Sequence, residues 1–421
     1  MSSLLLGSAI FIITYALIVS ERINKTIAAL AGGLVMVLLG IITQEQAFKH
    51  IDLNVIFLLA GMMILAGVMR KTGVFGWLAI GAARLAGGKP YRILVVLSLI
   101  TAGASALLDN VTTVVLVGPV TLFLSTRLGV SPIPFLVSEI LASNIGGTAT
   151  LIGDPPNLLI GSAAGLDFVA FLNHMAPVAV LSLAAFLVTA RWMFHDDLKV
   201  NPKRRDAVLN LDGREMITNP SLLRKSVIVL ALTLVGFLLH GPLGYGPASV
   251  ALTGAVVLLL VAGEDPREAL QEVEWPTLFF FIGLFMLVAG VIEVGLIEIL
   301  VQAALAITGG ALAPTAFLIM WLSAGLSGIV DNIPYTATMI PVVRELAPGP
   351  EGQVLWWALA LGADFGGNAT IIGASANVIL ASLADREGYP IGFWRFLKYG
   401  LLVTLETLVI ATIYVWLRYL F

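Results

Sequence analysis

Long apolar stretches recur along the whole chain, and they restrict its fold more than any other feature. Each approaches the length of a helix that crosses a bilayer, which is about 20 residues. Only 12% of the 421 residues are charged, against about 25% in soluble domains. Because only helices and closed barrels satisfy backbone groups in lipid, and these runs do not alternate, we expect an all-α polytopic membrane protein. The runs include Leu4–Val19, Ile27–Ile42, Val55–Met69, Val178–Phe194, Val227–Leu239, Ser249–Ala262 and Leu402–Leu417.

One polar pattern occurs twice within these apolar surroundings. The stretch NIGGTATLIGDPPN at 144–157 matches DFGGNATIIGASAN at 364–377, at a shift of 220 residues. At a shift of 222, the pair Asp109-Asn110 matches Asp331-Asn332. A nearly constant shift over so long a span indicates two homologous halves. We expect a first transmembrane repeat at 1–194, a polar linker at 195–225 and a second repeat at 226–421.

Each half is expected to contain five transmembrane helices, one re-entrant hairpin and one broken helix. An odd number of crossings places the second half in the opposite orientation, which is the inverted-repeat architecture of many secondary transporters. The first half divides into spans at 3–20, 24–42 and 53–69, an interfacial piece at 73–88, a hairpin at 92–126 interrupted at 108–110, a broken span at 134–164 and a last span at 169–194.

The basic residues orient this arrangement. With the sides alternated along the chain, all of the 23 Lys and Arg residues except Lys49, Arg344 and Arg418 fall on one side. An excess of Lys and Arg marks the cytoplasmic side. The sequence therefore predicts a multi-pass inner-membrane protein with a cytoplasmic linker at 195–225 and both termini outside the cytoplasm.

Four polar clusters interrupt the apolar segments at membrane depth. Carboxylates are costly in lipid, so a functional role is the default interpretation. The alternative is that Asp109 and Asp331 only cap the hairpin helices. The candidate substrate- or ion-binding residues are Asp109, Asn110, Thr113, Asn144, Thr148, Thr150, Asp154, Asn157, Asp331, Asn332, Thr336, Asp364, Asn368, Thr370 and Asn377.

Glycines and prolines within these clusters predict the helix breaks. Glycine lets a chain leave helical geometry, and proline removes an amide donor and prevents a helix from continuing. Half-helix ends then present partial charges to a ligand, and two such breaks can form one midplane site. The predicted break residues are Gly146, Gly147, Pro155, Pro156, Gly366 and Gly367.

The remaining chemistry is limited. Glu139 and Glu406 are candidates for a proton relay, because both are acidic residues within apolar segments. The chain has no cysteine, which excludes disulfides and thiolate metal sites, and it has no motif of an ATPase or hydrolase. We expect neither an enzyme nor a cofactor or metal site, with Na⁺ or H⁺ as the coupling ion.

The four clusters contain aspartates but no Lys, Arg or His, which favours a cation or a neutral polyhydroxy solute over an anion. The stretches SNIGGTATLIGDPPN (143–157), DNIPYTATMIP (331–341) and GGNATIIGASAN (366–377) resemble the ArsB/NhaD and P-protein group of permeases in the ion transporter superfamily. The likeness covers essentially the whole chain, and it is closer to the P-protein-like subgroup than to the best-known arsenical pumps. In the dicarboxylate branch, Ser-Asn-Thr motifs stand where this chain has Asp109-Asn110-Val111 and Asp331-Asn332-Ile333.

The resemblance implies an inverted repeat, two hairpins and alternating access. It also implies a cargo among arsenite or antimonite, silicic acid, and Na⁺ exchanged for H⁺. Our first hypothesis is an arsenical pump membrane protein that exports arsenite or antimonite in exchange for protons. The alternatives are a Na⁺/H⁺ antiporter of the NhaD type and a Na⁺-coupled anion or dicarboxylate transporter. A passive channel or a non-transporting scaffold is a further alternative, against which the two broken helices and opposed hairpins argue. The expected partners are a small inorganic solute and the lipid bilayer. A cytoplasmic ATPase subunit or a second copy of the chain is a further candidate partner, and no nucleic acid is expected.

Overall fold

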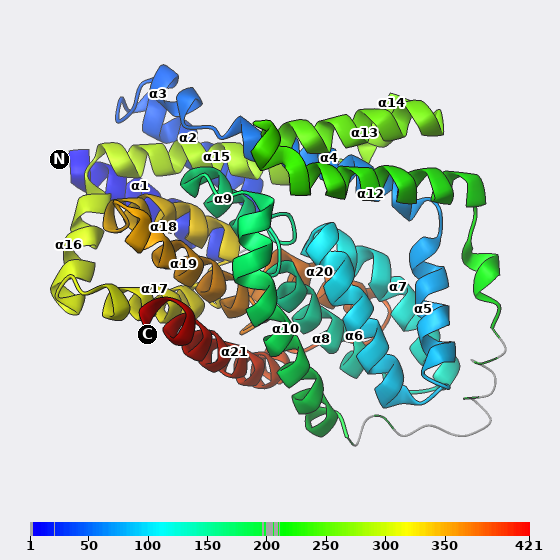
Figure 1. Cartoon of the computed structure of the whole chain (residues 1–421). Helices are drawn as coiled ribbons and strands as arrows, with labels where there is room; N and C mark the ends of the chain where they lie inside the picture. Colours follow the sequence, from blue (N-terminus) through cyan, green and yellow to red (C-terminus); the bar gives the residue numbers. More distant parts are fainter. Residues whose placement is uncertain (1–2, 21, 196–197, 199–204, 206–208, 210) are drawn as a thin grey trace.

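The computed structural model describes residues 3–20, 22–195, 198, 205, 209 and 211–421, and the regular elements of that part of the chain are all helical. Of the predicted linker at 195–225, residues 196–197, 199–204, 206–208 and 210 lie outside the described residues. Figure 1 shows a set of helices along the top of the view and a larger bundle beneath it.

The upper set, here called the panel, combines helices from both halves of the chain. Helix α2 packs against α15, and α4 packs against α13, so the first and second halves interleave. The panel helices are α1 (Ser3–Ser20), α2 (Lys25–Leu38), α4 (Leu53–Arg70), α12 (Pro220–Leu243), α13 (Pro247–Ala262) and α15 (Trp275–Glu293).

The lower set, here called the core bundle, contains two hairpins, two broken helices and two long helices. Helix α6 packs on α8, and α17 packs on α19 in the same way. The bundle helices are α6 (Pro90–Leu107), α7 (Asn110–Leu128), α8 (Ile133–Gly147), α9 (Pro155–Ala164), α10 (Phe168–Met193), α17 (Leu312–Ser327), α18 (Asn332–Leu346), α19 (Gln353–Gly366), α20 (Ser375–Arg386) and α21 (Phe393–Val415).

Shorter elements join these two sets. Helices α5 (Val74–Leu85) and α16 (Leu296–Thr308) stand at opposite ends of the panel and lead from it into the hairpins (Figure 1). Both start after a left-handed glycine, Gly73 and Gly295, which allows the sharp turn out of the panel. The remaining pieces are α3 (Gln44–Lys49), α14 (Pro266–Gln271), η1 (Gly213–Met216), η2 (Pro350–Gly352), η3 (Ile371–Gly373) and η4 (Trp416–Leu420).

The order of helices repeats between the halves, from α1 with α12 through α10 with α21. The predicted spans at 3–20, 24–42, 53–69 and 169–194 correspond to α1, α2, α4 and α10. Within the described chain, eight helices are long and apolar enough to cross a membrane, or nine if α16 and α17, which meet at 119°, form one span. The protein is therefore an all-helical, multi-span membrane protein.

The first hairpin, α6–α7, is interrupted at Leu108–Asp109 as expected, but its helices are not short. They have 18 and 19 residues and are long enough to cross a membrane on their own. In the second hairpin, α17–α18, the helices have 16 and 15 residues. Asp109 and Asp331 are the N-caps of the second helix in each hairpin, and each accepts a backbone hydrogen bond there.

The glycines at the breaks have a different role from the predicted one. Gly146 and Gly147 lie inside α8 in helical conformation, so they do not bend the chain. A Cβ on Gly146 would lie 2.2 Å from the carbonyl oxygen of Ala102 in α6, and one on Gly366 would lie 2.6 Å from Ala324 in α17. The absence of a side chain therefore allows each broken helix to pack directly on its hairpin.

Gly147 is the last residue of α8 and Gly367 caps the end of α19, and Gly367 has helical backbone angles. Gly147 lies against Gly153, and Gly367 lies against Gly373, the glycine on the other side of its break. A Cβ on Gly147 would lie 2.6 Å from the carbonyl oxygen of Gly153. Pro155 and Pro156 begin α9 rather than end α8, since proline is well suited to the first turn of a helix. The chain thus folds back on itself between 148 and 154.

Candidate functional site

The two helix breaks meet in the middle of the core bundle, where they form a buried cluster of amide and carboxylate side chains. Its eight members come from both breaks and from both hairpin tips, and each is at most 2% exposed. We call this group the asparagine cluster. It consists of Asp154, Asp364, Asn110, Asn144, Asn157, Asn332, Asn368 and Asn377.

Asp154 connects the first break to both hairpins. The Nδ2 of Asn110, at the tip of the first hairpin, donates to Asp154 Oδ2 at 2.8 Å. The Nδ2 of Asn332, at the tip of the second hairpin, donates to Asp154 Oδ1 at 3.3 Å. One fully buried carboxylate therefore joins segments that are 178 residues apart in the chain.

Asn144 and Asp364 occupy matching positions in the two breaks, yet they are bonded differently. Asn144 Nδ2 donates across the bundle to Asn368 Oδ1 and to Asn377 Oδ1, both at 2.9 Å. Asp364 lies beside the side chains of Asn157 and Thr148. Neither of its carboxylate oxygens has a hydrogen-bond partner among the described residues.

Several further polar atoms around the cluster are buried without a partner in the described chain. A buried polar group without a partner is costly, so these atoms are available to bind a ligand, an ion or water. Most of them are oxygens, which suit a cation. They are Asn110 Oδ1, Thr113 Oγ1, Asn157 Oδ1, Thr336 Oγ1 and Asn368 Nδ2.

Two of the predicted threonines, Thr150 and Thr370, hydrogen-bond to backbone carbonyls of the hairpins and not to the asparagine cluster. Thr150 donates to the carbonyl of Ala106 at 2.5 Å, and Thr370 donates to the carbonyl of Gly328 at 2.7 Å. Thr148 donates within its own helix, to the carbonyl of Asn144 at 2.8 Å. Each bond of Thr150 and Thr370 ties a hairpin to the break beside it.

Two serines that the sequence patterns did not single out make matching ties. Ser105 donates to the carbonyl of Ser143, and Ser327 donates to the carbonyl of Ala363, both at 2.7 Å. They are related by the same shift of 222 that relates the hairpin aspartates. That shift is the signal by which they could have been found.

The amides of Asn157 and Asn377 close the two break loops in the same way. Asn377 Nδ2 donates to the carbonyls of Gly367 and Thr370, at 2.7 and 2.9 Å. Asn157 Nδ2 donates to the carbonyl of Thr150 at 3.1 Å. The freed carbonyls of each break are thus satisfied by a side chain that follows it.

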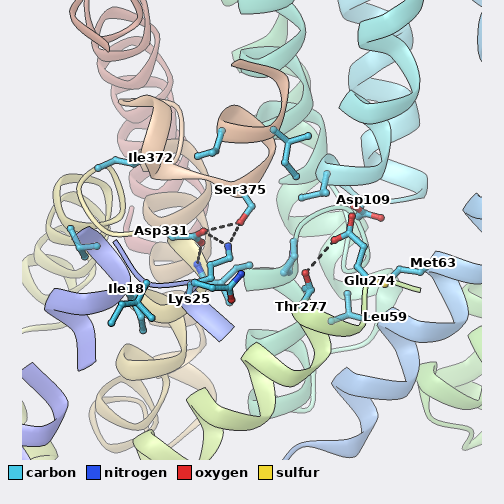
Figure 2. Close-up of a pocket in the computed structure, with 18 of the residues that line it drawn as sticks. Ile18, Lys25, Leu59, Met63, Asp109, Glu274, Thr277, Asp331, Ile372 and Ser375 are labelled. Carbon is cyan, nitrogen blue, oxygen red and sulfur yellow. Dashed lines mark hydrogen bonds and ion pairs between the residues drawn. The ribbon is translucent and has the colours of Figure 1, made fainter. Parts of the chain in front are cut away.

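A cavity of about 310 Å³ lies between the panel and the core bundle, next to the hairpin tips. Its walls come from the α1–α2 loop, the middle of α4, the start of α15, both hairpin tips and the second break. Most of the lining is apolar, and the charged residues form two groups on opposite sides of the view in Figure 2. Because it lies beside both hairpin tips and carries charged side chains, this cavity suits a small polar solute.

Lys25 and Asp331 form the first charged group. Lys25 Nζ is 3.0 Å from Asp331 Oδ2 and 2.6 Å from Ser375 Oγ, and Ser375 donates to the same Asp331 oxygen at 2.8 Å (Figure 2). Lys25 was not among the predicted site residues, because it lies at the start of an apolar helix and its partner is 306 residues away. The four clusters themselves contain no basic residue, but Lys25 brings one to the cavity from outside them.

Asp109 and Glu274 form the second charged group (Figure 2). Glu274 precedes α15 and accepts a hydrogen bond from Thr277 Oγ1 at 3.2 Å. Burial raises the pKa of the Glu274 carboxyl, and the like charge of Asp109 raises it further. The cavity therefore contains three carboxylates, of Asp109, Glu274 and Asp331, and one ammonium group.

The two glutamates predicted as proton relays lie apart from the asparagine cluster. Glu139 is 1% exposed and accepts a hydrogen bond from Thr121 in α7. Glu406 in α21 accepts one from Thr189 in α10 at 2.7 Å. Each keeps one oxygen without a partner among the described residues, and neither hydrogen-bonds to the cluster.

The side chains of the asparagine cluster offer mainly oxygen ligands. In the described chain no group of three or more His, Cys, Asp and Glu side chains is placed to bind one metal ion. The cluster instead combines two carboxylates with neutral amides, whose oxygens are ligands that hard cations prefer.

Relatives of the chain are transporters and membrane proteins. It is 49% identical over 97% of both chains to an uncharacterized transporter of Mycobacterium tuberculosis, and 46% identical over 98% of both to a 46 kDa membrane protein of Mycobacterium leprae. It is also 34% identical to the P protein of Homo sapiens, covering 94% of this chain and 57% of that protein. The predicted likeness to P proteins is therefore confirmed.

A solved structure and a family model agree with this placement. The YdaH transporter of Alcanivorax borkumensis superposes with a TM-score of 0.61 over 99% of this chain and 98% of that one, at 16% identity, so the two share a fold. Residues 15–362 match the model of the citrate transporter family, CitMHS. The chain therefore belongs to the CitMHS family of the ion transporter superfamily, and it is a secondary transporter, not an enzyme.

Proposed function

We propose that the protein exchanges arsenite or antimonite for protons, with the coupling ion at Asp154 and Asp364 and the cargo in the cavity beside Asp331. The observation that carries this proposal is the pair of fully buried aspartates where the two broken helices meet. Two carboxylates buried near each other cannot both stay charged without a cation. A proton or a monovalent cation must therefore accompany them.

The cavity supports a neutral cargo. It has three carboxylates and one ammonium group, so a trianion such as citrate, which the family is named after, would be repelled. Arsenite and antimonite are neutral hydroxides at neutral pH and would need only hydrogen bonds, as would silicic acid. Asp331, Ser375 and Asn24 line the cavity and can supply them.

We propose that the halves, 1–194 and 226–421, have opposite orientations in the membrane, and that the bundle moves relative to the panel between two states. The repeated helix order and the segregation of basic residues support this arrangement. The linker would be cytoplasmic and both termini outside. The cavity would then open toward the cytoplasm, because the α1–α2 loop and the start of α15 lie on that side.

Uptake into inverted vesicles tests the proposal. Vesicles containing the full chain, with an imposed inside-acid gradient, should accumulate arsenite above the level in vesicles without the protein. Asp364→Asn should abolish accumulation, and Lys398→Ala, at an exposed position on the same predicted side, should not. Absence of uptake by the parent protein would refute the arsenite assignment.

A second candidate is Na⁺/H⁺ exchange, which the unpartnered oxygens favour. Asp364, Asn110, Asn157, Thr113 and Thr336 present carboxylate, amide and hydroxyl oxygens around one buried region, which suits Na⁺. In proteoliposomes with an internal pH dye, Na⁺ should then release protons without any other solute. No response to Na⁺ between pH 6 and 9 would exclude this candidate, and a response to citrate alone would favour the dicarboxylate alternative.

A further inference from the structure

The contact between Lys25 and Asp331 joins the two sets of helices that the proposed function requires to move apart. Lys25 is the first residue of α2 in the panel, whereas Asp331 caps α18 and Ser375 begins α20 in the core bundle. The three side chains form a closed triangle of 3.0, 2.6 and 2.8 Å (Figure 2). One ammonium group thus links the panel to a hairpin tip and to a helix break together.

The surroundings of Lys25 keep this contact strong. The Asp331 side chain is only 12% exposed and that of Lys25 is 35% exposed, so water screens the pair less than on an open surface. Lys25 Nζ also lies 5.2 Å from the ring centre of Phe280 in α15. Nearby, the Tyr15 hydroxyl of α1 hydrogen-bonds to Pro334 and Thr338 in the second hairpin.

Among the described residues, the first hairpin makes no ion pair with the panel equivalent to that of Asp331. The shift of 222 pairs Asp331 with Asp109, and it pairs Lys25 with Pro247, which carries no charge. In the cavity, the charged neighbour of Asp109 is Glu274, a second carboxylate. The panel therefore presents an ammonium group to one hairpin tip and a carboxyl group to the other, although the two hairpins are repeats of each other.

We propose that Lys25 is an electrostatic latch that holds the second hairpin against the panel in the cavity-open conformation and must release Asp331 before the bundle moves. The inference rests on the proposed alternating access, not on the identity of the cargo. Since the pair joins the panel to the core bundle in the conformation described here, the latch biases the resting protein toward the open cavity. Removal of the ammonium group removes that bias.

Thiol accessibility measures this bias directly, because the chain has no cysteine of its own. Ile329, which lines the cavity and is 57% exposed, is replaced by Cys in the full chain, and inverted vesicles are treated with a membrane-impermeant maleimide. Adding Lys25→Ala to Ile329→Cys should slow labelling about threefold or more, as expected for losing a partly buried ion pair. Lys25→Arg and the distant control Lys398→Ala should label like Ile329→Cys alone.

A charge exchange separates the latch from a merely structural lysine. Lys25→Asp should slow labelling at least as much as Lys25→Ala, and combining it with Asp331→Lys should restore the rate to within about twofold. Equal labelling in Lys25→Ala and the parent, or no rescue by the exchange, would overturn the latch. The readout needs no cargo, so failure of arsenite transport would leave this test intact.

Discussion

Replacing Gly146 by Ala tests the packing on which the site depends. The added Cβ would lie 2.2 Å from the carbonyl oxygen of Ala102 and 2.5 Å from its Cα, whereas ordinary contacts begin near 3.4 Å. The obstacle is backbone, so no side chain can rotate away. Helices α6 and α8 must separate by most of that difference, and Ala102 is only 4% exposed.

Overpacking of this kind costs about 1–3 kcal/mol, and we expect about 3 kcal/mol because backbone opposes backbone. For a chain of 421 residues, the apparent melting temperature should fall by about 3 °C. Gly103→Ala is the matched control, because Gly103 lies next to Ala102 in α6 and a Cβ there would meet nothing within 4 Å. That change should be neutral or slightly stabilising, since Ala favours a helix over Gly by about 1 kcal/mol.

The assay is thermal unfolding of the purified protein in detergent, followed by the fluorescence of its eight tryptophans. Gly366→Ala, which meets Ala324 at 2.6 Å in the second half, should behave like Gly146→Ala. If Gly146→Ala melts within about 1 °C of Gly103→Ala, then the packing of α8 on α6 does not require a glycine at 146, and the reasoning is refuted.

Three further predictions concern the asparagine cluster, the hairpin ties and an ion pair of the panel. Asp364→Asn should lower ion-coupled transport by at least about 100-fold, because it removes the buried carboxylate that would carry the ion. The protein should still fold, because neither carboxylate oxygen has a hydrogen bond among the described residues that the substitution would break. Normal coupling in vesicles would exclude Asp364 as the ion carrier. Thr150→Val and Thr370→Val should each lower the free energy of unfolding by about 1–2 kcal/mol and leave cargo affinity unchanged, as measured by melting and by uptake at graded cargo concentrations. The hydrogen bond to Glu264 raises the pKa of Lys71, so the ion pair adds stability below the ordinary lysine pKa and loses it as pH rises through the raised value. Because the pair is partly exposed, Lys71→Met should cost less than about 1 kcal/mol in melting experiments at neutral pH, and that cost should disappear once the pH exceeds the raised pKa of Lys71.

Much of the fold could be predicted because the chain carries its pattern twice. Asp109 and Asp331 were expected at hairpin interruptions, and both cap the helix that follows. The breaks after Gly147 and Gly366 also lie where the repeated stretch placed them. In each case a local sequence signal, compared with its copy, was sufficient.

The rest depends on contacts that no local pattern encodes. Lys25 looks like an ordinary basic residue at the end of a span, and its role follows only from packing against a hairpin 306 residues away. Gly146 was assigned to chain bending, but the reason for a glycine there is the backbone of Ala102, on another helix. Sequence alone cannot separate these two uses of glycine, since both leave the same residue in the same place.

The ties between each hairpin and its break separate what the two halves share from what they do not. Thr150 and Thr370, like Ser105 and Ser327, occupy matching positions and satisfy matching carbonyls, so the same framework of bonds occurs in both halves. Lys25 has no such counterpart. A substitution at Lys25 therefore alters one hairpin alone, while the paired ties keep both hairpins bound to their breaks.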